Sequence, residues 1–352
     1  MKTLQLFITL LLMANFSFSQ DVYRKIDSIL KDAHAKNSNI SFSVGFIKND
    51  TEFYTSYGNL NRENTIKVDK RSLFEIASIT KILTSNLIAN AALEGKLNTN
   101  DFIDAYLPKA YQLHKKLQQK IKISDLASHQ SGLPDIDFRA LINANSQQPI
   151  DAVNQQTLSE IINNCSALID YGNYRYSTIG YVLLGQILET VYNKTYPELL
   201  KEKLTSPLKL TRTFSTEFRV DNTVQGYNAN GGTQELFNWN ITGSAGLVKS
   251  NTLDMTTYLK AVLNENNTLG KAALLCEETQ YNKGGRQLGL GLNILKDEKN
   301  TVFLKTGDLL GQSSIMAYDR EHNWGIVLFL NQRNHKLRQE LFYNILEIIK
   351  TK

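Results

Sequence analysis

The stretch TVFLKTGDLLGQSSIMAYDREHNWGIVLFL, residues 301–330, is the part of the sequence that indicates the fold most clearly. It contains three short runs rich in β-branched and aromatic residues, at 301–305, 313–319 and 324–330, with turn residues between them. Such runs at close spacing are typical of antiparallel strands. Because a similar run at 287–295 precedes them, we predict a group of strands in the last third of the chain.

Two further strand-like runs lie near the start of the chain, at 40–47 and 52–57, and a polar turn joins them. Residues 22–36 and the segment from Leu337 to Ile349 carry apolar side chains at helical spacing. One antiparallel sheet built from the first and last segments, with both terminal helices on it, would bury these apolar stripes. We therefore predict an α+β fold in which an antiparallel sheet is flanked by the N- and C-terminal helices.

The middle of the chain is predicted to be mostly helix and loop, with clear helices over 78–94 and 177–192. It would form an inserted, mainly helical lobe. We predict a single catalytic domain over 20–352, with an α/β lobe at about 20–75 and 226–352 and the helical lobe at about 76–225. A cleft between two lobes is a usual place for a functional site.

The first twenty residues, MKTLQLFITLLLMANFSFSQ, differ from the rest of the chain. One cation at Lys2 precedes an apolar stretch, and small residues at Ser17 and Ser19 follow it. This pattern predicts a cleaved signal peptide over 1–19 and a periplasmic or secreted protein. The apolar stretch is too short to span a bilayer comfortably, so we expect no integral membrane span in the mature form.

Composition excludes several function classes. Of the 352 residues, 42% are hydrophobic and 21% charged, and the net charge of +5 is dispersed without a basic run, so we expect no nucleic-acid partner. The five histidines are scattered without a metal-binding spacing, and no metal site is predicted. Cys165 and Cys276 could pair in an exported protein, but two buried free thiols are the simpler expectation.

Ser78-Ile79-Thr80-Lys81 is the first motif that carries chemistry. Residues three apart on a helix share a face, which brings the Lys81 amine within reach of the Ser78 hydroxyl. Such an amine can take the serine proton and activate the hydroxyl as a nucleophile. Alone the pattern is weak, because Ser-x-x-Lys also occurs at 28–31 and 206–209.

Two further segments complete the candidate site. Lys305-Thr306-Gly307 ends a predicted strand, where a sheet edge can pair with an extended substrate and Gly307 permits close backbone approach. Tyr176 precedes the helix predicted at 177–192. A tyrosine is normally a poor base, but the positive charges of Lys81 and Lys305 nearby would favour its phenolate.

In this order, SITK, YST and KTG resemble the motifs of the serine β-lactamase and penicillin-binding-protein superfamily. That family has SxxK, then Tyr-x-Asn, then Lys-Thr-Gly. The resemblance is to the branch of class C β-lactamases, D-alanyl-D-alanine carboxypeptidases and related esterases, and it runs from about residue 40 to 331. Supporting stretches are ISDLASHQSGLPD at 123–135, YSTIGYVLLGQILE at 176–189 and GSAGLVKSNTLDMTTYL at 243–259.

The resemblance implies a role for each matched residue. Ser78 would be the acylated nucleophile, Lys81 its partner on the helix, and Tyr176 the proton shuttle. The backbone N–H groups of Ser78 and Asp308 would form the oxyanion hole. The predicted substrate-binding residues are Thr178, Lys305, Thr306, Gly307 and Asp308. The family also implies neither a metal nor an organic cofactor, and a small-molecule or peptidoglycan-peptide substrate.

Two positions depart from the family pattern. Thr178 stands where the family usually has Asn, and its short hydroxyl lacks the amide group that would bond a peptide-like substrate. A literal Tyr-x-Asn occurs at 171–173, but the helix that follows places Tyr176 in register instead. The charge of Asp308 would repel an anionic substrate unless it points away. For His129, in the loop that the family places near the cleft rim, we expect a structural role with bonds to backbone.

The sequence thus favours hydrolysis of an amide, β-lactam or ester carbonyl through an acyl-enzyme at Ser78. The alternatives are a small-ester hydrolase and a penicillin- or peptide-binding protein without turnover. A secreted α+β protein whose motifs are coincidental is the third alternative. Pocket shape and deacylation rate distinguish the substrates, and the sequence fixes neither.

Overall fold

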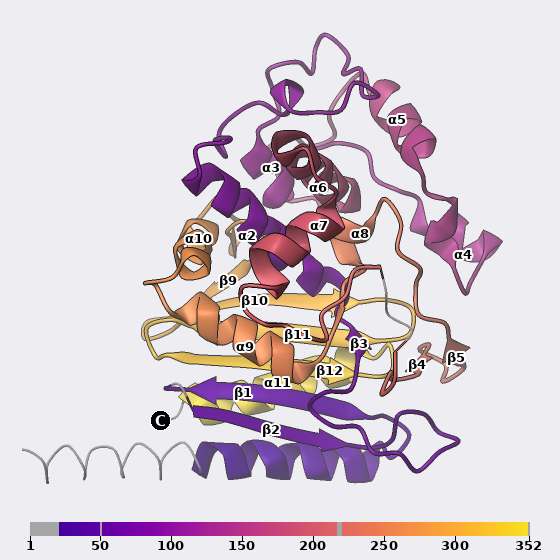
Figure 1. The fold of residues 1–352 in the computed structure, drawn as a ribbon, viewed down its shortest axis with the longest axis vertical. Helices are drawn as coiled ribbons and strands as arrows, with labels where there is room; N and C mark the ends of the chain where they lie inside the picture. The colour runs from indigo at the N-terminus through magenta and orange to yellow at the C-terminus, as the bar shows by residue number, and fades with distance from the viewer. Residues whose placement is uncertain (1–20, 50, 217–219, 351–352) are drawn as a thin grey trace, which may run out of the picture.

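The computed structural model describes residues 21–49, 51–216 and 220–350, and the predicted signal peptide at 1–19 lies outside them. Its centre is an eight-stranded sheet in the order β2-β1-β12-β11-β10-β9-β8-β7, in which every neighbouring pair is antiparallel (Figure 1). The strands are β1 (Phe42–Lys48), β2 (Thr51–Tyr57), β7 (Tyr281–Lys283), β8 (Arg286–Leu288), β9 (Asn293–Lys296), β10 (Thr301–Asp308), β11 (Ser313–Asp319) and β12 (Trp324–Leu330). The first and last segments of the chain thus share one sheet, as predicted.

The interior strand β12 is buried on both faces, which explains its continuous apolar sequence. Ile326 and Leu328 belong to the core on one side of the sheet. Val327 and Phe329 belong to the core on the other side. Because side chains alternate along a strand, each face of β12 supplies one of the two cores.

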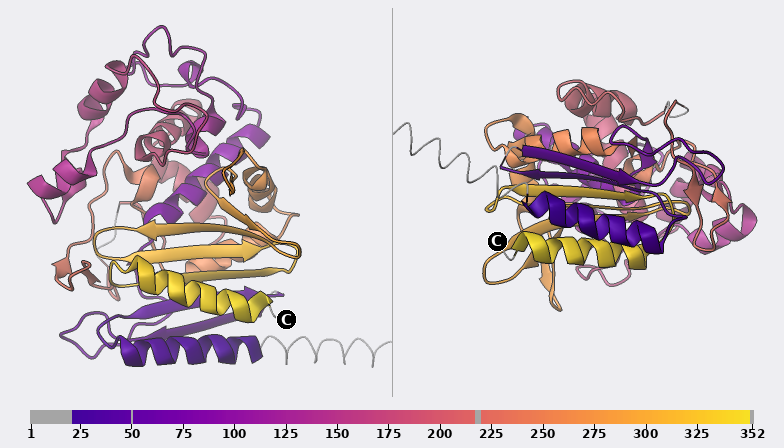
Figure 2. Two further views of the ribbon diagram at one scale, coloured as in Figure 1. Left: turned by 180° about the vertical axis from the view of Figure 1, so that it is seen from behind. Right: turned by 90° about the horizontal axis from the view of Figure 1, so that it is seen from below.

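The terminal helices cover one face of the sheet. A helix through residues 21–36 and α11 (His335–Lys350) lie side by side there (Figure 2). Ile26 and Leu30 of the first helix, and Leu341 and Ile345 of α11, are buried in the core that includes β1 and β12. The predicted packing of both terminal helices on one antiparallel sheet is confirmed.

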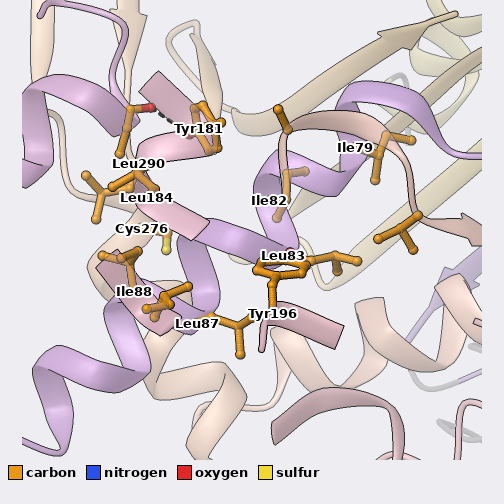
Figure 3. Packing of buried hydrophobic residues seen from close by; sticks show 14 of the residues in the cluster. Ile79, Ile82, Leu83, Leu87, Ile88, Tyr181, Leu184, Tyr196, Cys276 and Leu290 are labelled. Carbon is orange, nitrogen blue, oxygen red and sulfur yellow. Dashed lines mark hydrogen bonds between the residues drawn. The ribbon is translucent and has the colours of Figure 1, made fainter. Parts of the chain in front are cut away.

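The other face carries the helices that hold the site. These are α2 (Thr80–Leu93), α6 (Thr178–Tyr192), α8 (Gly243–Gly246), α9 (Thr252–Leu263) and α10 (Thr268–Glu277). Helix α2 is buried almost all round, and Leu83, Leu87 and Ile88 pack among side chains from α6, α10 and the loop before β9 (Figure 3). Since α8 to α10 follow residue 226, this helical layer draws on both of the predicted lobes.

The remaining short elements connect these layers. The helices are η1 (Ala77–Ile79), η2 (Ile103–Ala105), α3 (Ile123–Ala127), α4 (Phe138–Ala144), η3 (Pro149–Ala152), α5 (Gln155–Asn163), α7 (Tyr196–Leu200) and η4 (Lys201–Thr205). The strands β3 (Phe74–Glu75) and β6 (Lys249–Ser250) pair with each other, as do β4 (Gly226–Tyr227) and β5 (Thr233–Gln234). Within the described chain, no helix is long and apolar enough to cross a membrane.

The structure differs from the prediction at 287–295. That run is two strands, β8 and β9, separated by a tight turn in which Gly291 has a φ of +78°. The Gly291 N–H donates to Ala127 O, and the Gly289 N–H donates to Leu292 O. Leu290 and Leu292 are nevertheless buried, so their apolar character comes from core packing and not from a strand.

Packing of α11 on the sheet is expected to contribute strongly to stability. Ile345 is fully buried, whereas Tyr343 on the same helix is 48% exposed. We expect Ile345→Ala to lower the free energy of unfolding by about 2–4 kcal/mol through lost burial and a cavity. Urea denaturation measures this change, with Tyr343→Ala as the control. Equal midpoints for the two variants would contradict the placement of α11.

Candidate active site

Ser78 lies in η1, the single turn between β3 and α2. The preceding residue, Ala77, has a φ of +50°, a left-handed conformation that is unfavourable for a residue with a Cβ. The turn leaves the Ser78 side chain half-buried at the edge of a cavity, while Ala77 and Ile79 are buried. The predicted helix from Ser78 thus begins as a turn of 3₁₀ helix, and α2 proper starts at Thr80.

The structure brings the predicted catalytic side chains together. The hydroxyl oxygens of Ser78 and Tyr176 are 2.7 Å apart. Lys81 Nζ donates to Ser78 Oγ at 3.4 Å and to the carbonyl oxygen of Ala245 at 2.5 Å. Lys81 is 1% exposed, so its amine meets protein groups instead of bulk water. An amine and a phenol thus both reach the serine hydroxyl, and either can take its proton when it is itself deprotonated, which is the geometry of an activated nucleophile.

Two lysines flank the ring of Tyr176. Lys81 Nζ lies 5.0 Å and Lys305 Nζ 5.2 Å from the ring centroid. Lys305 is also buried, and its Nζ is 3.4 Å from Nε2 of His129. Ser78, Tyr176 and Lys305 are far apart in the sequence, so it is the fold that brings their side chains together.

Burial changes the charge that these lysines carry. Loss of hydration lowers the pKa of the Lys81 ammonium to about 7, although nearby Asp135 acts in the opposite direction. Burial likewise lowers the pKa of Lys305 to about 8; the Tyr176 hydroxyl opposes this shift and Lys81 adds to it. Near neutral pH, Lys81 is therefore present in part as a free amine, which can accept a proton.

His129 is a buried loop residue with bonds to backbone, as expected. Its Nδ1 accepts from the Ser177 N–H at 3.2 Å, and its carbonyl accepts from the Arg175 N–H at 2.8 Å. Its ring centroid lies 4.5 Å from that of Tyr176. Burial and the surrounding cations hold the pKa of the His129 imidazole well below its usual value. A neutral ring that contacts Tyr176 and Lys305 fixes both side chains in the cleft.

The segment from Lys305 to Asp308 offers a free strand edge beside Ser78. In the described sheet, β9 pairs only with residues 301–304 of β10, while β11 pairs with β10 up to Asp308. Thr306 and Asp308 line the cavity with Ser78. An extended substrate could pair with this edge, as predicted from the Lys-Thr-Gly motif.

Gly307 fits where a side chain would not. A Cβ at this position would lie 2.4 Å from Ser314 Oγ, 2.7 Å from Ile76 O and 2.9 Å from the Cβ of Ala77. The Ser314 hydroxyl donates to Ile76 O at 2.9 Å. The strand therefore approaches the turn that holds Ser78 closely, and Asp308, the next residue of the strand, lines the same cavity as Ser78.

The carboxylate of Asp308 is engaged by neighbours. Its Oδ1 accepts from Ser313 Oγ at 2.6 Å, and its Oδ2 accepts from Arg338 Nη1 of α11 at 2.5 Å. Arg338 also donates to the carbonyl oxygen of Gly307 at 3.0 Å. The ion pair compensates the charge that would otherwise repel an anionic substrate. Arg338 lies in α11 outside any recognisable motif, so the sequence did not identify it as a neighbour of the site.

Thr178 is the first residue of α6 and lines the cavity. Asp135 accepts from the N–H groups of Thr178 and Ile179, at 2.8 and 3.0 Å, and so caps this helix. Tyr171 of the literal Tyr-x-Asn instead donates to Lys120 O and Asp125 Oδ2, both at 2.8 Å. Tyr176 and not Tyr171 therefore faces Ser78. Asp135 was missed as a site residue, although it ends the quoted segment 123–135.

The described residues contain no cluster of three His, Cys, Asp or Glu side chains that could hold a metal ion. Cys165 and Cys276 are free and buried. The cavity beside Ser78 has a volume of about 360 Å³. This is within the range of small-molecule sites.

The family model described as Beta-lactamase matches residues 26–350, and the chain therefore belongs to the beta-lactamase family. Protein flp of Staphylococcus aureus (strain NCTC 8325 / PS 47) is 25% identical over 327 residues, which cover 89% of this chain and 64% of that protein. A Beta-lactamase of Providencia stuartii is 28% identical over 261 residues, covering 73% of this chain and 64% of that protein. The chain thus spans less than two thirds of the length of these curated relatives.

Solved structures share the fold at low sequence identity. A beta-lactamase/D-alanine carboxypeptidase from Pseudomonas syringae superposes with a TM-score of 0.80 and 20% identity, covering 93% of this chain and 99% of that one. An octameric penicillin-binding protein homologue from Pyrococcus abyssi gives a TM-score of 0.79 at 20% identity, covering 93% of this chain and 77% of that one. The resemblance read from the motifs is confirmed for family and fold.

Close approach of β10 to the Ser78 turn generates one prediction. We expect Gly307→Ala to lower the rate at which a fluorophosphonate probe labels Ser78 by at least about 100-fold, because the new Cβ forces the strand and turn apart. The control is Gly232→Ala, whose Cβ would have as its nearest neighbour the amide nitrogen of the Asn228 side chain, at 3.0 Å, and would meet no backbone atom that closely. Wild-type labelling by a folded Gly307→Ala protein would contradict this geometry.

The lowered pKa of Lys81 generates a second prediction. Below pH 7 the ammonium cannot accept the Ser78 proton, and above pH 7 the free amine can. Labelling of Ser78 should therefore rise about tenfold from pH 6 to pH 8, following the fraction of free amine. Lys81→Arg, which stays protonated, should label slowly and lose this rise. A wild-type rate that is independent of pH would exclude Lys81 as the titrating group.

Proposed function

We propose that this protein is an exported serine hydrolase that cleaves an amide, β-lactam or ester carbonyl through an acyl-enzyme on Ser78. The observation that carries the proposal is the approach of two proton acceptors to one hydroxyl, the Tyr176 oxygen at 2.7 Å and the buried Lys81 amine at 3.4 Å. Export rests on the predicted signal peptide at 1–19, and a periplasmic or secreted location follows from it.

Acylation would proceed by attack of Ser78 Oγ on the substrate carbonyl. The serine proton passes to Tyr176 or Lys81, and the backbone N–H groups of Ser78 and Asp308 hold the negative oxygen of the tetrahedral intermediate. The same proton then moves to the leaving group as its bond to the carbonyl carbon breaks. Thr306 and Lys305 lie along the strand edge where the substrate would pair.

Deacylation would reverse these roles. A water molecule gives its proton to the free Lys81–Tyr176 pair and attacks the ester carbonyl, and Ser78 Oγ recovers a proton as the acid leaves. Since neither acylation nor deacylation needs redox chemistry, the chain's own side chains suffice for this mechanism. The rate of deacylation distinguishes a hydrolase from a penicillin- or peptide-binding protein that stays acylated.

A small-ester hydrolase is a second candidate, and the residue at 178 favours it. The Thr178 side chain has one hydroxyl in place of the amide that could bond both a substrate and a lysine. An ester substrate does not need recognition of a peptide-like amide. A D-alanyl peptide or a β-lactam is also a candidate substrate, because the family and the fold support both.

We expect Ser78→Ala to lower hydrolysis of p-nitrophenyl esters, a chromogenic cephalosporin or a D-Ala-D-Ala peptide by at least about 1,000-fold, because the nucleophile is lost. The matched control is Ser28→Ala, since Ser28 opens another Ser-x-x-Lys but is exposed on the helix at 21–36. Rates of product release, and the mass of the protein after reaction, measure the effect.

The outcomes separate the candidates. Turnover that needs Ser78 supports the hydrolase, and the substrate turned over identifies its kind. A stable adduct of fluorescent penicillin on Ser78 without turnover favours the binding protein. Unchanged turnover in Ser78→Ala would overturn the proposal.

A further inference from the structure

The cavity beside Ser78 has a strongly apolar side. Its lining includes Phe138 and Ile142 of α4, Ile150 of η3, Phe237, and Leu309 and Leu310 after β10. We call these six residues the apolar wall. They come from four separate parts of the chain, so the wall is not a by-product of one amphipathic helix. Ile142, Leu309 and Leu310 are half-buried and line the cavity, and the two leucines also pack against a small cluster that contains Ile150 and Phe237.

Buried charged side chains hold part of the apolar wall in place. Phe237 is 3% exposed and packs with Ile150 and Leu247 in a small separate core cluster. Its backbone N–H donates to Glu75 Oε1 at 2.8 Å, and its backbone carbonyl accepts from Lys249 Nζ. Glu75 and Lys249 are a fully buried ion pair, with Oε1 and Nζ 3.9 Å apart. Two buried charges that bind one backbone residue fix its position firmly.

The same elements carry the nucleophile. Glu75 ends β3, which leads through Ile76 into the turn of Ser78, and Lys249 lies on β6, its partner strand. The position of Phe237 is therefore tied to the position of Ser78. A preformed apolar surface next to a reactive hydroxyl is the usual setting of a substrate subsite.

The apolar wall begins beside the place that the substrate carbonyl would occupy. Tyr176 and Lys81 reach Ser78 Oγ, and Lys305 flanks the Tyr176 ring. In the proposed mechanism a proton travels from this cluster to the leaving group. Leu309 and Leu310 directly follow Asp308, whose N–H is the proposed second oxyanion donor. The two leucines therefore lie next to the proposed position of the carbonyl, where the acyl chain of a substrate can reach the wall.

The charged residues that line the cavity do not oppose an apolar group there. The Asp308 carboxylate is paired with Arg338. Arg333 also lines the cavity, but it is exposed to solvent. Lys81, the buried cation of the lining, already contacts Ser78 Oγ and the carbonyl oxygen of Ala245. None of these three charged side chains therefore needs a charged acyl group as its partner.

We propose that the apolar wall is an acyl-chain subsite, and that the preferred substrates are esters with an uncharged acyl chain of about four to eight carbons. This rests on the proposed acyl-enzyme function, and it adds the substrate class. Each methylene transferred from water to the wall is worth up to about fourfold in kcat/KM. Peptides that end in charged or small polar residues would gain nothing from the wall.

The test is a series of p-nitrophenyl esters, from acetate through butyrate and hexanoate to octanoate, with the leaving group held constant. We expect kcat/KM of the full chain to be at least about tenfold higher for hexanoate than for acetate. Ile142→Ser should reduce this hexanoate-to-acetate ratio by about threefold or more, since it removes apolar surface from the wall. The control is Leu141→Ser, the adjacent half-buried residue of α4, which packs on the main core and does not line the cavity.

Further outcomes distinguish the subsite from the proposed function. A ratio of one or less in the wild type, with hydrolysis still dependent on Ser78, overturns the acyl-chain subsite alone. An equal loss of the ratio in both α4 variants also overturns it, because the effect would then be structural. Two results would overturn both the subsite and the proposed function: protein mass that shows no acylation by any ester, or hydrolysis that persists in Ser78→Ala. A higher kcat/KM for an acyl chain that ends in a carboxylate than for hexanoate would also overturn the apolar subsite, because Arg333 would then bind the charged end.

Discussion

Burial of the Lys81 amine beside the Ser78 hydroxyl is the constraint on which the rest of the site depends. A lysine in water stays charged and cannot take a proton, whereas desolvation brings its pKa to about 7. The fold keeps the amine dry by burying α2 almost all round. Polar side chains on the next turn of α2 are satisfied internally: Thr84 bonds to Tyr196 and Ser85 to Tyr181, with oxygens 2.7 and 3.0 Å apart.

The buried lysine is useful only because the sheet approaches the same turn. Ile76 connects the two layers, since its N–H donates to Val248 O at 3.1 Å and its carbonyl accepts from Ser314. Gly307 allows β10 to pass within van der Waals distance of Ala77. The left-handed φ of Ala77 is tolerated because contacts from both sides determine its conformation. Ser78, the buried Lys81 amine and the edge of β10 are thus held together between the sheet and the helices.

Much of this could be predicted from the sequence, for identifiable reasons. The runs at 313–319 and 324–330 match β11 and β12, because strong β formers are separated by clear turns. Ser78, Lys81, Tyr176 and Lys305 were found because each stands in a short motif of recognisable chemistry. Helix α9 was not assigned because it is buried on several sides, which weakens its amphipathic pattern. Helix α10 carries an exposed apolar residue, Leu274, and strand β7 is three residues long with only Tyr281 buried, so neither gives a clear pattern. The Arg338–Asp308 and Glu75–Lys249 pairs join residues that only tertiary packing brings together, so local pattern gives no sign of them.

The most direct test of the account is an experimental structure of the protein after reaction with a p-nitrophenyl alkylphosphonate, which leaves a tetrahedral adduct on an activated serine. The account predicts a bond from phosphorus to Ser78 Oγ, with a phosphoryl oxygen within hydrogen-bond distance of the N–H groups of Ser78 and Asp308. Lys81 Nζ and the Tyr176 hydroxyl would remain beside Oγ. An adduct on another residue, or one at Ser78 whose oxygen points away from both N–H groups, would contradict it.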